Sequence, residues 1–476
     1  MDYLSLAAWI LSAVLFLLTI AVAAVVVSEN RNPVRTLAWL TVLLVVPVFG
    51  LILYFVFGRD IRTRRAVTRR MKRKLRRQEK ISRPDLRLVP VSRSSKGLMR
   101  VADKFGAVGL HQGNAATYFV DGGEKMKSLF ADISRAEQYI YLQYYIIEDD
   151  SLGEELARRL IDRASAGVKI YVIFDPVGSV GTSRGYFRRM EDAGIRVKPF
   201  IPVRFPGFGT RINWRNHRKQ VVIDGTVAYV GGMNIASRYV DGGKEFNSWR
   251  DLHLRLEGSV VAAVESSFIT DWSFMGDDYA ELLHNVRPPA RKAGDLTMQF
   301  VTSGPTSQWY NIEMLFLKAI GSATKRIFIE TPYFLPTEAL VNALQTAALS
   351  GVDVRIMMPR RSDSLILTSA SASYVAECLR AGIKIYYYTP GMLHSKMMIV
   401  DDELVTIGST NFDYRSFEHN FEGNMFIYSG EFNSRMTAEF FDGLRQSERV
   451  VPEQWASRGW RRRLSESVLR LLAPIL

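Results

Sequence analysis

The second half of the chain repeats the order of strands and helices that the first half predicts. Apolar and β-branched runs on either side of a helical stretch predict strand, helix and strand, at 139–143, 152–166 and 169–174 and again at 326–330, 337–350 and 353–358. Thr337 is expected to cap its helix. Strands that alternate with helices predict a sheet covered on both faces, so the fold class is α/β, with two pseudo-symmetric α/β/α sandwich domains packed together.

One spaced set of polar residues occurs in each half. The first half contains HRKQVVID followed by GGMN, and the second contains HSKMMIVD followed by GSTN, with equal spacings. The residues are His217, Lys219, Asp224, Gly232 and Asn234, and then His394, Lys396, Asp401, Ser409 and Asn411. A single set can arise by chance, because these residue types are common on surfaces. Two sets at equivalent places in a repeat indicate a functional site.

The spacing within each set has a geometric reason. On a strand, His217 and Lys219 are two residues apart and point to one face, as do His394 and Lys396. If a pseudo-twofold axis relates the halves, both pairs converge on one anion pocket that suits a phosphodiester. The lysines would supply positive charge and the two asparagine amides would donate hydrogen bonds. One histidine can then act as nucleophile and the other as acid and base.

The aspartate that ends each motif is interpreted as structural support. Asp224 and Asp401 each precede a residue typical of turns, and an aspartate at a strand end is ordinary there. The first half also has extra chain around 200–216, which is either a substrate-facing loop or a surface insertion. Four histidines have no lysine two residues later and are expected at the surface or in packing: His111, His253, His284 and His419.

Two uncharged stretches at the N-terminus predict membrane helices. Tyr3 to Ser28 and Thr36 to Gly58 contain no charged residue, and each exceeds the ~20 residues that a helix needs to cross hydrocarbon. A signal peptide is the alternative, but its start is usually basic and this one carries Asp2. We therefore expect a hairpin of two spans, in which packing absorbs a kink at Pro47.

A basic run follows the second stretch. Twelve of the residues from Arg59 to Lys80 are Lys or Arg, and the whole chain carries a net charge of +14. Basic residues beside a span favour the cytoplasmic side, so with two spans both termini are expected in the cytoplasm. The run is either a solvated linker or a site for anionic lipid head groups. The single cysteine, Cys378, excludes an intrachain disulfide and a cysteine-based metal site.

The last residues predict an amphipathic helix. Apolar residues recur at helical spacing among arginines, so the helix either lies at a membrane interface or packs on the protein; they are Leu464, Val468, Leu471, Leu472 and Ile475. The predicted organisation is two membrane helices in 1–58, a basic linker in 59–95, two domains in 96–295 and 296–455, and this helix in 456–476.

The duplicated HxKx4Dx6G(G/S)xN pattern resembles the phospholipase D superfamily, over roughly residues 110 to 450. The two predicted spans, the ETPYFLP segment at 330–336 and the WRDLHLRLEG segment at 249–258 are similar to those of bacterial cardiolipin synthases. The resemblance implies two phospholipase D-like domains that join two phosphatidylglycerol molecules and release glycerol. It also implies a phosphohistidine intermediate.

The resemblance assigns roles to particular residues. By similarity, His217 is the nucleophile and His394 the general acid and base, although the pseudo-symmetry permits the reverse. The family places a carboxylate downstream of each motif to bond its histidine. Asp251 fits after the first motif, with Glu245 as a rival, and Glu422 fits after the second. No cofactor and no metal are expected, because the lysines take the metal's place.

Several functions remain open at this stage. Hydrolysis of phospholipids, or transfer to another alcohol, would use the same chemistry. A nuclease would too, but two membrane spans disfavour a nucleic-acid partner, and a non-catalytic scaffold would not need both complete motifs. The expected partners are phosphatidylglycerol, other anionic lipids and the membrane. The expected location is the bacterial inner membrane, multi-pass, with the catalytic part facing the cytoplasm.

Overall fold

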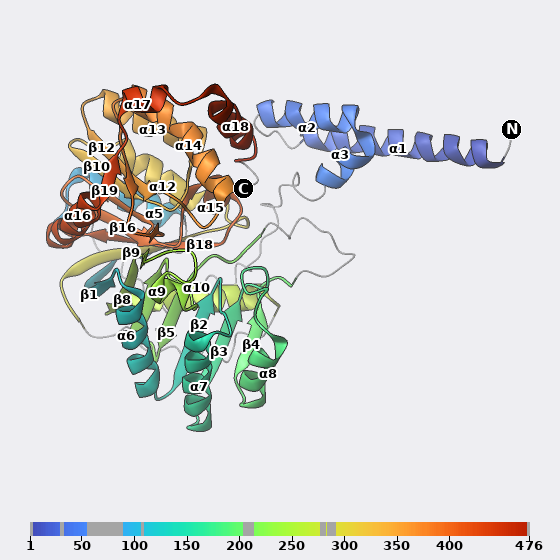
Figure 1. Cartoon of the computed structure of the whole chain (residues 1–476). Coiled ribbons are helices and arrows are strands. Elements are labelled where there is room, and N and C mark those ends of the chain that lie inside the picture. Colours follow the sequence, from blue (N-terminus) through green and yellow to red (C-terminus); the bar gives the residue numbers. More distant parts are fainter. Residues whose placement is uncertain are drawn as a thin grey trace. The chain divides into compact units, whose positions relative to one another are not determined.

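The computed structural model describes residues 3–28, 33–54, 89–105, 109–202, 214–276, 282 and 292–473 (Figure 1). The chain forms two compact units. One comprises residues 1–63 with 202–214, and the other comprises 64–201 with 215–476. The basic run at 59–80, His284 and most of the extra chain at 200–216 lie outside the described residues.

The larger unit is built on one fifteen-stranded sheet, in the order β19-β13-β12-β10-β15-β16-β18-β9-β1-β8-β6-β5-β2-β3-β4. Apart from β19, the order is a palindrome about the β9–β1 pair, so each strand of one half has a counterpart in the other. The bounds are β1 (His111–Phe119), β2 (Tyr139–Tyr144), β3 (Lys169–Phe174), β4 (Arg196–Pro199), β5 (Gln220–Ile223), β6 (Val227–Gly231), β8 (His253–Glu257), β9 (Leu296–Ser303), β10 (Arg326–Glu330), β12 (Asp353–Pro359), β13 (Lys384–Tyr388), β15 (Met397–Val400), β16 (Leu404–Gly408), β18 (Glu422–Tyr428) and β19 (Ser447–Arg449).

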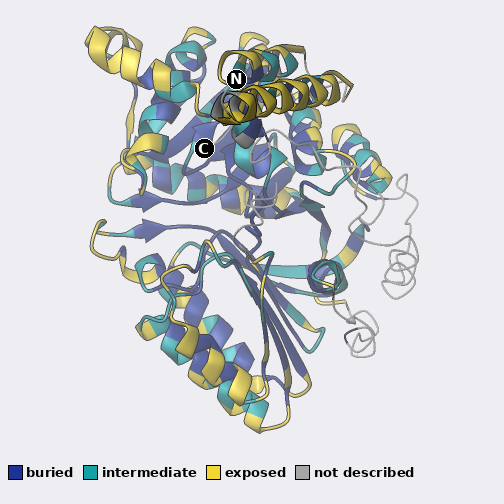
Figure 2. Cartoon of the chain, turned by 90° about the vertical axis from the view of Figure 1, so that its right-hand side faces the viewer, coloured by how far each residue is buried: buried dark blue, intermediate teal, exposed yellow. Residues whose placement is uncertain are grey.

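Helices cover both faces of this sheet. They are α5 (Arg93–Lys104), α6 (Gly122–Arg135), α7 (Ser151–Ser165), α8 (Arg184–Asp192), α9 (Arg238–Asp241), α10 (Val261–Phe274), α12 (Asn311–Ile320), α13 (Glu338–Leu349), α14 (Leu365–Arg380), α15 (Tyr414–Glu418), α16 (Gly430–Arg445), α17 (Pro452–Ala456) and α18 (Trp460–Arg470). Figure 2 shows buried strands between helices whose outward faces are exposed. The six predicted strands and helices of the repeat are confirmed, within two residues at each end.

Alternation along the central strands explains the two helical layers. In β2, Ile140 and Leu142 pack in one core with α6, α7 and α8, whereas Tyr141 points the other way and stacks on Phe268 of α10 at 4.8 Å. β10 repeats the pattern, because Phe328 stacks on Phe440 of α16 at 4.8 Å. The expected α/β/α layering of both halves is therefore present.

Two details of the body differ from the sequence-based expectation. Thr337 precedes α13, but its hydroxyl donates to Glu313 at 2.5 Å and makes no capping bond. The reason is that a buried carboxylate competes with the backbone amides for that hydroxyl. In addition, α5 packs in the core of the second half, where Leu98 and Met99 share a cluster with Phe316 of α12, although the predicted organisation put residues from 96 onward in the first domain.

The aspartates that end the motifs accept hydrogen bonds from the start of the neighbouring strand. Asp224 accepts hydrogen bonds from the amides of 137, 138 and 139, where β2 begins, and Asp401 does the same for 324, 325 and 326 before β10. Both have left-handed backbones, with φ of 52° and 51°. Asparagine and aspartate tolerate this conformation better than other residues that carry a Cβ.

Asp224→Ala is therefore expected to destabilise the fold by about 2 kcal/mol. The substitution leaves backbone amides without their hydrogen-bond acceptor and puts alanine in a left-handed turn. The melting temperature should fall, and the activity of the folded fraction should be kept. Asp224→Asn is the matched control, because it retains an acceptor and tolerates the turn. A normal melting temperature with lost activity in Asp224→Ala would instead place the aspartate in the chemistry.

In its described part, the smaller unit consists of α1 (Tyr3–Ser28), α2 (Pro33–Val45) and α3 (Pro47–Leu53). Their packing buries Val22, Val26, Leu43, Leu51 and Tyr54. Among the described residues, one helix is long and apolar enough to cross a membrane, and its apolar part is 9–28. This segment indicates membrane anchoring.

The second predicted span is interrupted. Val46 leaves helical geometry at φ −134° and ψ 70°, and Pro47 begins a new helix. Proline removes one backbone hydrogen bond and its ring disfavours a helical residue before it. Gly50 lies so near the preceding turn that a Cβ there would sit 2.7 Å from the Val42 carbonyl oxygen. The described part of this stretch, 36–54, is therefore not a single straight helix.

Candidate active site

Both histidine–lysine pairs lie in extended segments that lead into strands. His217 and Lys219 precede β5, while His394 and Lys396 precede β15. The prediction that these residues lie within strands is therefore wrong by a few positions. Because β5 is antiparallel to β2 and β15 to β10, both segments lie at the sheet edge where β2 and β10 end.

Backbone bridges between the halves explain why these segments leave the main sheet. The amide of His217 donates to the carbonyl oxygen of Phe421 at 2.9 Å, and the amide of His394 donates to that of Arg250 at 2.7 Å. The second bridge extends a parallel pairing of β7 (Trp249–Arg250) with β14 (Met392–Leu393). The residue after each of these carbonyls is acidic. Each histidine is thus held beside a carboxylate of the opposite half.

The two histidine–carboxylate contacts are crossed between the halves. Nδ1 of His217 lies 2.9 Å from Oε1 of Glu422, and Nδ1 of His394 lies 2.6 Å from Oδ2 of Asp251. The sequence singled out the same carboxylates but paired each with the histidine of its own half, so the partners must be exchanged. Glu245, the rival to Asp251, is exposed. Both contacts use Nδ1 of the histidine ring.

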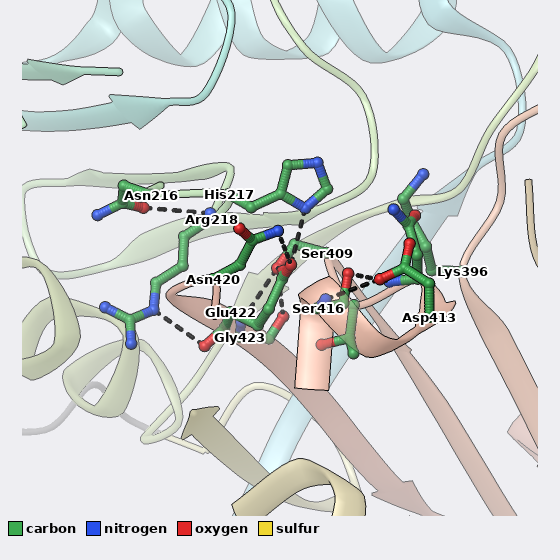
Figure 3. Close-up of polar contacts among 12 residues, drawn as sticks. Asn216, His217, Arg218, Lys396, Ser409, Asp413, Ser416, Asn420, Glu422 and Gly423 are labelled. Carbon is green, nitrogen blue, oxygen red and sulfur yellow. Dashed lines mark hydrogen bonds and ion pairs between the residues drawn. The ribbon is translucent and has the colours of Figure 1, made fainter. Parts of the chain in front are cut away.

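Glu422 has several donors around its carboxylate (Figure 3). The Ser409 hydroxyl donates to Oε2, and the Asn420 amide donates to Oε1 at 3.3 Å. Burial alone would raise the pKa of Glu422, but His217 and Lys219 lower it below its ordinary value. Glu422 is therefore a carboxylate that only accepts hydrogen bonds, and Nδ1 of His217 must be the donor.

Asp251 is held more closely by the backbone. Its Oδ1 accepts from the Leu252 amide at 2.7 Å, and a Cβ on Gly232 would lie 2.1 Å from the same oxygen. The glycine at 232 is thus required for the carboxylate to fit, whereas the equivalent Ser409 is the residue that reaches Glu422. Burial raises the pKa of Asp251 to about 6, against the opposing charge of Lys396. The GG and GS variants of the motif therefore serve different carboxylates.

The two lysines lie against the histidines. Nζ of Lys219 donates to the carbonyl oxygen of His217 at 2.7 Å, and Nζ of Lys396 lies 2.8 Å from Nδ1 and 3.1 Å from Nε2 of His394. Burial lowers the pKa of Lys396 to about 8 and that of Lys219 well below its ordinary value. Repulsion from the Lys396 ammonium also lowers the pKa of Lys219. An anion between them would favour the charged forms.

The histidines are uncharged near neutral pH. Burial lowers the pKa of His217 to about 4, although Glu422 acts in the opposite sense. Burial, followed by the charge of Lys396, also places the pKa of His394 well below its ordinary value. With its Nδ1–H donated to Glu422, His217 carries its lone pair on Nε2, which is the form a nucleophile requires.

The asparagines of the motifs hold loops in place. The Asn234 amide group donates to the Tyr239 hydroxyl at 2.6 Å, and its oxygen accepts from the Ile146 amide at 3.1 Å. The backbone amide of Asn411 donates to the Ser416 hydroxyl at 3.2 Å. The expected hydrogen bonds from both asparagines to a phosphate remain a prediction.

Two buried arginines join the halves around the site, and the sequence analysis did not single them out. Arg218, which follows the first motif histidine, pairs with Asp271 at 2.5 Å and donates to the carbonyl oxygen of Glu422 at 3.0 Å. Arg250, which precedes the first-half carboxylate, lies 3.0 Å from Glu439. A buried charge needs such partners. The sequence signal that could have found them is their position, since Arg218 directly follows His217 and Arg250 directly precedes Asp251.

Exposed apolar side chains occur in two segments whose neighbouring residues approach the histidines. Val180, in the loop after β3, is 84% exposed, and Leu365, at the start of α14, is 69% exposed. Gly178 of the first loop lies against Tyr145, whose ring centroid is 5.0 Å from that of His217. Asp363, two residues before Leu365, is near enough to raise the pKa of His394. Apolar groups beside an anion pocket suit a lipid phosphate.

The remaining described histidines lack the contacts with a motif lysine and a carboxylate given above. His111 is in β1 and His253 in β8, both buried, and His419 follows α15. Over the part of the chain that the structure describes, no group of three or more His, Cys, Asp or Glu side chains is placed to hold a metal ion.

The decline of kcat/KM with rising pH is expected to steepen above about 8, because the buried Lys396 loses its proton and its positive charge there. His217 stays neutral down to about pH 4, so its protonation sets only a distant acid limb. A profile of kcat/KM against pH checks this, and Lys396→Arg should move the basic limb upward if it folds. A flat profile to about pH 10 would contradict the assignment.

Comparisons with known proteins agree with this arrangement. The family model described as "Cardiolipin synthase, PLD-like domain" matches residues 129–272 and 316–443, one match in each half. A second model, for a phospholipase D-nuclease N-terminal segment, matches residues 17–59.

Similar proteins extend over nearly the whole chain. The chain is 38% identical to a cardiolipin synthase of Geobacillus kaustophilus over 465 residues, which cover 96% of this chain and 92% of the relative. It is also 38% identical to a cardiolipin synthase of Listeria monocytogenes, covering 99% of this chain and 100% of the relative. The solved phosphatidylserine synthase of Haemophilus influenzae has the same fold, with a TM-score of 0.60 at 13% identity over 80% of this chain and 100% of that chain.

Proposed function

We propose that this chain, which belongs to the cardiolipin synthase family of phospholipase D-like proteins, transfers the phosphatidyl group of one phosphatidylglycerol to another and releases glycerol. The observation that carries the proposal is the pair of crossed histidine–carboxylate contacts with a lysine against each histidine. Such a site holds a phosphodiester between two imidazoles. The names of the full-length relatives point to the donor and the product.

In the first step, Nε2 of His217 attacks the phosphorus of a bound phosphatidylglycerol. A P–N bond forms and the P–O bond to the head-group glycerol breaks, while His394 gives its proton to the departing oxygen. When the negatively charged phosphodiester binds, it raises the pKa of His394, so that His394 becomes protonated and can donate that proton. Glu422 stabilises the positive charge that develops on His217.

In the second step, a head-group hydroxyl of a second phosphatidylglycerol attacks the phosphohistidine. His394 accepts the proton of that hydroxyl, the P–N bond breaks, and His217 is regenerated with cardiolipin as the product. Asp251 orients His394 for both transfers through the 2.6 Å contact. Lys219 and Lys396 neutralise the phosphate oxygens as charge builds on them.

The remaining motif residues have supporting roles in this proposal. Asp224 and Asp401 fix the strand ends from which the histidine segments are placed. Asn234 and Asn411 shape the loops beside the pocket, and Ser409 holds Glu422. None of these five side chains exchanges a proton with the substrate.

The membrane arrangement follows from α1 and the segment after it. α1 anchors the chain in the bilayer. The return crossing lies in the segment that contains the kinked helices α2 and α3. The basic run at 59–80 then lies on the cytoplasmic side of the bacterial inner membrane, where the catalytic unit would meet anionic lipid.

The test is to incubate the purified full chain with phosphatidylglycerol as the sole lipid and to measure lipid products by mass spectrometry, with free glycerol in parallel. Cardiolipin with an equal amount of glycerol is expected. Phosphatidic acid with glycerol would mean that water is the acceptor, which makes the chain a phospholipase. No reaction with phosphatidylglycerol, but transfer to another added alcohol, would mean a different acceptor.

A further inference from the structure

The C-terminal helix α18 has two different apolar faces. One face is buried, with Glu466 only 3% exposed and Leu469 and Ala473 packed against the core of the second half. The other face is open to solvent. An α-helix turns about 100° per residue, so residues 460, 464, 468 and 471 share a stripe roughly opposite residues 466, 469 and 473.

The buried face carries ion pairs within the C-terminal segment and one to the neighbouring helix α14. Glu466 accepts from Arg458 at 2.7 Å and from Arg462 at 3.1 Å. Arg470 lies 2.8 Å from Glu377 of α14, and its guanidinium stands 4.1 Å above the Tyr374 ring. These contacts set the rotation of α18 about its own axis. The orientation of the open face is therefore a built feature of the fold.

The open face is large, apolar and unpartnered in this unit. Trp460 is 65% exposed, Leu464 55%, Val468 52% and Leu471 78%. These four residues form the outer stripe, at spacings of four, four and three. Isolated apolar residues are normal on a protein surface, but a continuous stripe of this kind marks an interaction site. Burial of a tryptophan and three aliphatic side chains is the driving force that such a site offers.

The charge beside the outer stripe selects the partner. Arg461 and Arg463 are exposed next to it, and the Arg461 guanidinium stands 5.6 Å from the Trp460 ring. The only acidic residue from 460 to 473 is Glu466, which is buried on the other face. The open face is thus apolar at its centre and positive at its margin. A bilayer with anionic head groups has the complementary layering.

We propose that the outer stripe of α18 binds the surface of a membrane that contains anionic phospholipid, and so forms a second attachment of the catalytic unit besides α1. Tryptophan is favoured at the depth where head groups meet acyl chains. A symmetric contact with a second copy of the chain fits less well, because the same arginines would face each other across it. This proposal does not depend on which lipid reaction the enzyme performs.

A probe attached at position 468 tests this in the full chain. Cys378 is buried, with its thiol pKa raised to about 12, so a maleimide fluorophore reacts with the new thiol of Val468→Cys alone. In vesicles of phosphatidylcholine with phosphatidylglycerol, we expect a blue-shifted emission, loss of most iodide quenching, and quenching by lipids that carry a spin label near the head group. In phosphatidylcholine alone these effects should be weaker.

Matched variants separate the stripe from general effects of charge. Leu471→Glu in the labelled protein should restore iodide quenching, whereas Leu349→Glu, at an equally exposed leucine at the end of α13, should not. A probe that stays accessible to iodide in anionic vesicles would overturn the proposal, as would a disulfide that links two copies of the unlabelled Val468→Cys variant. Cardiolipin formation measured on the same labelled protein shows separately whether the catalytic proposal holds.

Discussion

Replacing His217 with alanine is expected to lower kcat for cardiolipin formation by about 10⁴-fold or more, the scale seen when a nucleophile or its partner base is removed. His217 is neutral near pH 7, its Nδ1–H is directed to Glu422, and its Nε2 is the only atom assigned to form the P–N bond. The measurement is the initial rate of cardiolipin and glycerol release, with the melting temperature as the control for folding.

An activated substrate separates the two histidines. A phosphatidyl ester of p-nitrophenol has a leaving group that needs no proton, so it bypasses the general acid. His394→Ala should still release up to one equivalent of p-nitrophenol per chain as the phosphohistidine forms. His217→Ala should release none. The opposite result would exchange the roles of the histidines, while activity in both variants would contradict covalent catalysis.

The second large effect is expected at the crossed carboxylates. Glu422→Gln should lower kcat by about 10²–10⁴-fold, since an amide cannot stabilise the charge that develops on His217. Asp251→Asn should cause a loss of similar size with phosphatidylglycerol, because it removes the partner of His394.

The same activated ester shows which histidine each carboxylate serves. Glu422→Gln should slow release of p-nitrophenol, because it acts on the nucleophile, whereas Asp251→Asn should leave the initial burst almost unchanged. If each carboxylate served the histidine of its own half, the two results would be exchanged. Ser409→Ala provides a milder companion variant, since Glu422 keeps its contact with Asn420.

The duplication could be read from the sequence because local patterns encode it. Apolar and β-branched runs and helical spacing are short-range signals, and they placed β2, β3, β10 and β12 correctly. The motifs were found for the same reason. The palindromic strand order about β9 and β1 then follows from two equal halves that share one sheet.

The crossing of the carboxylates could not be predicted, because it depends on contacts between distant segments. The carbonyls of Arg250 and Phe421 each bond a histidine amide of the other half, about 140 to 200 residues away. Nothing in the local sequence around Asp251 or Glu422 encodes this pairing. The same bridges draw His217 and His394 out of the strands in which the spacing had placed them.

Other details depend on backbone geometry and on distant neighbours. Hydropathy marked 36–58 as one apolar stretch with a kink at Pro47, and in the structure a new helix begins at Pro47 after Val46 leaves helical geometry. The sequence left packing on the protein and a membrane interface as alternatives for the last helix, and in the structure one face of α18 packs on the second half while the other is exposed. The hydrogen-bonding roles of Asn234 and Asn411 needed knowledge of neighbours such as Tyr239 and Ser416.

The most direct test of the account is to locate the covalent intermediate. The full chain is mixed with phosphatidylglycerol labelled at its phosphate, quenched in alkali within one turnover, digested, and examined for labelled peptides by mass spectrometry. The account predicts an acid-labile phosphatidyl adduct on His217 that disappears when unlabelled phosphatidylglycerol is added before the quench, with cardiolipin appearing in step. Label on His394, or cardiolipin formed at full rate with no labelled histidine, would contradict it.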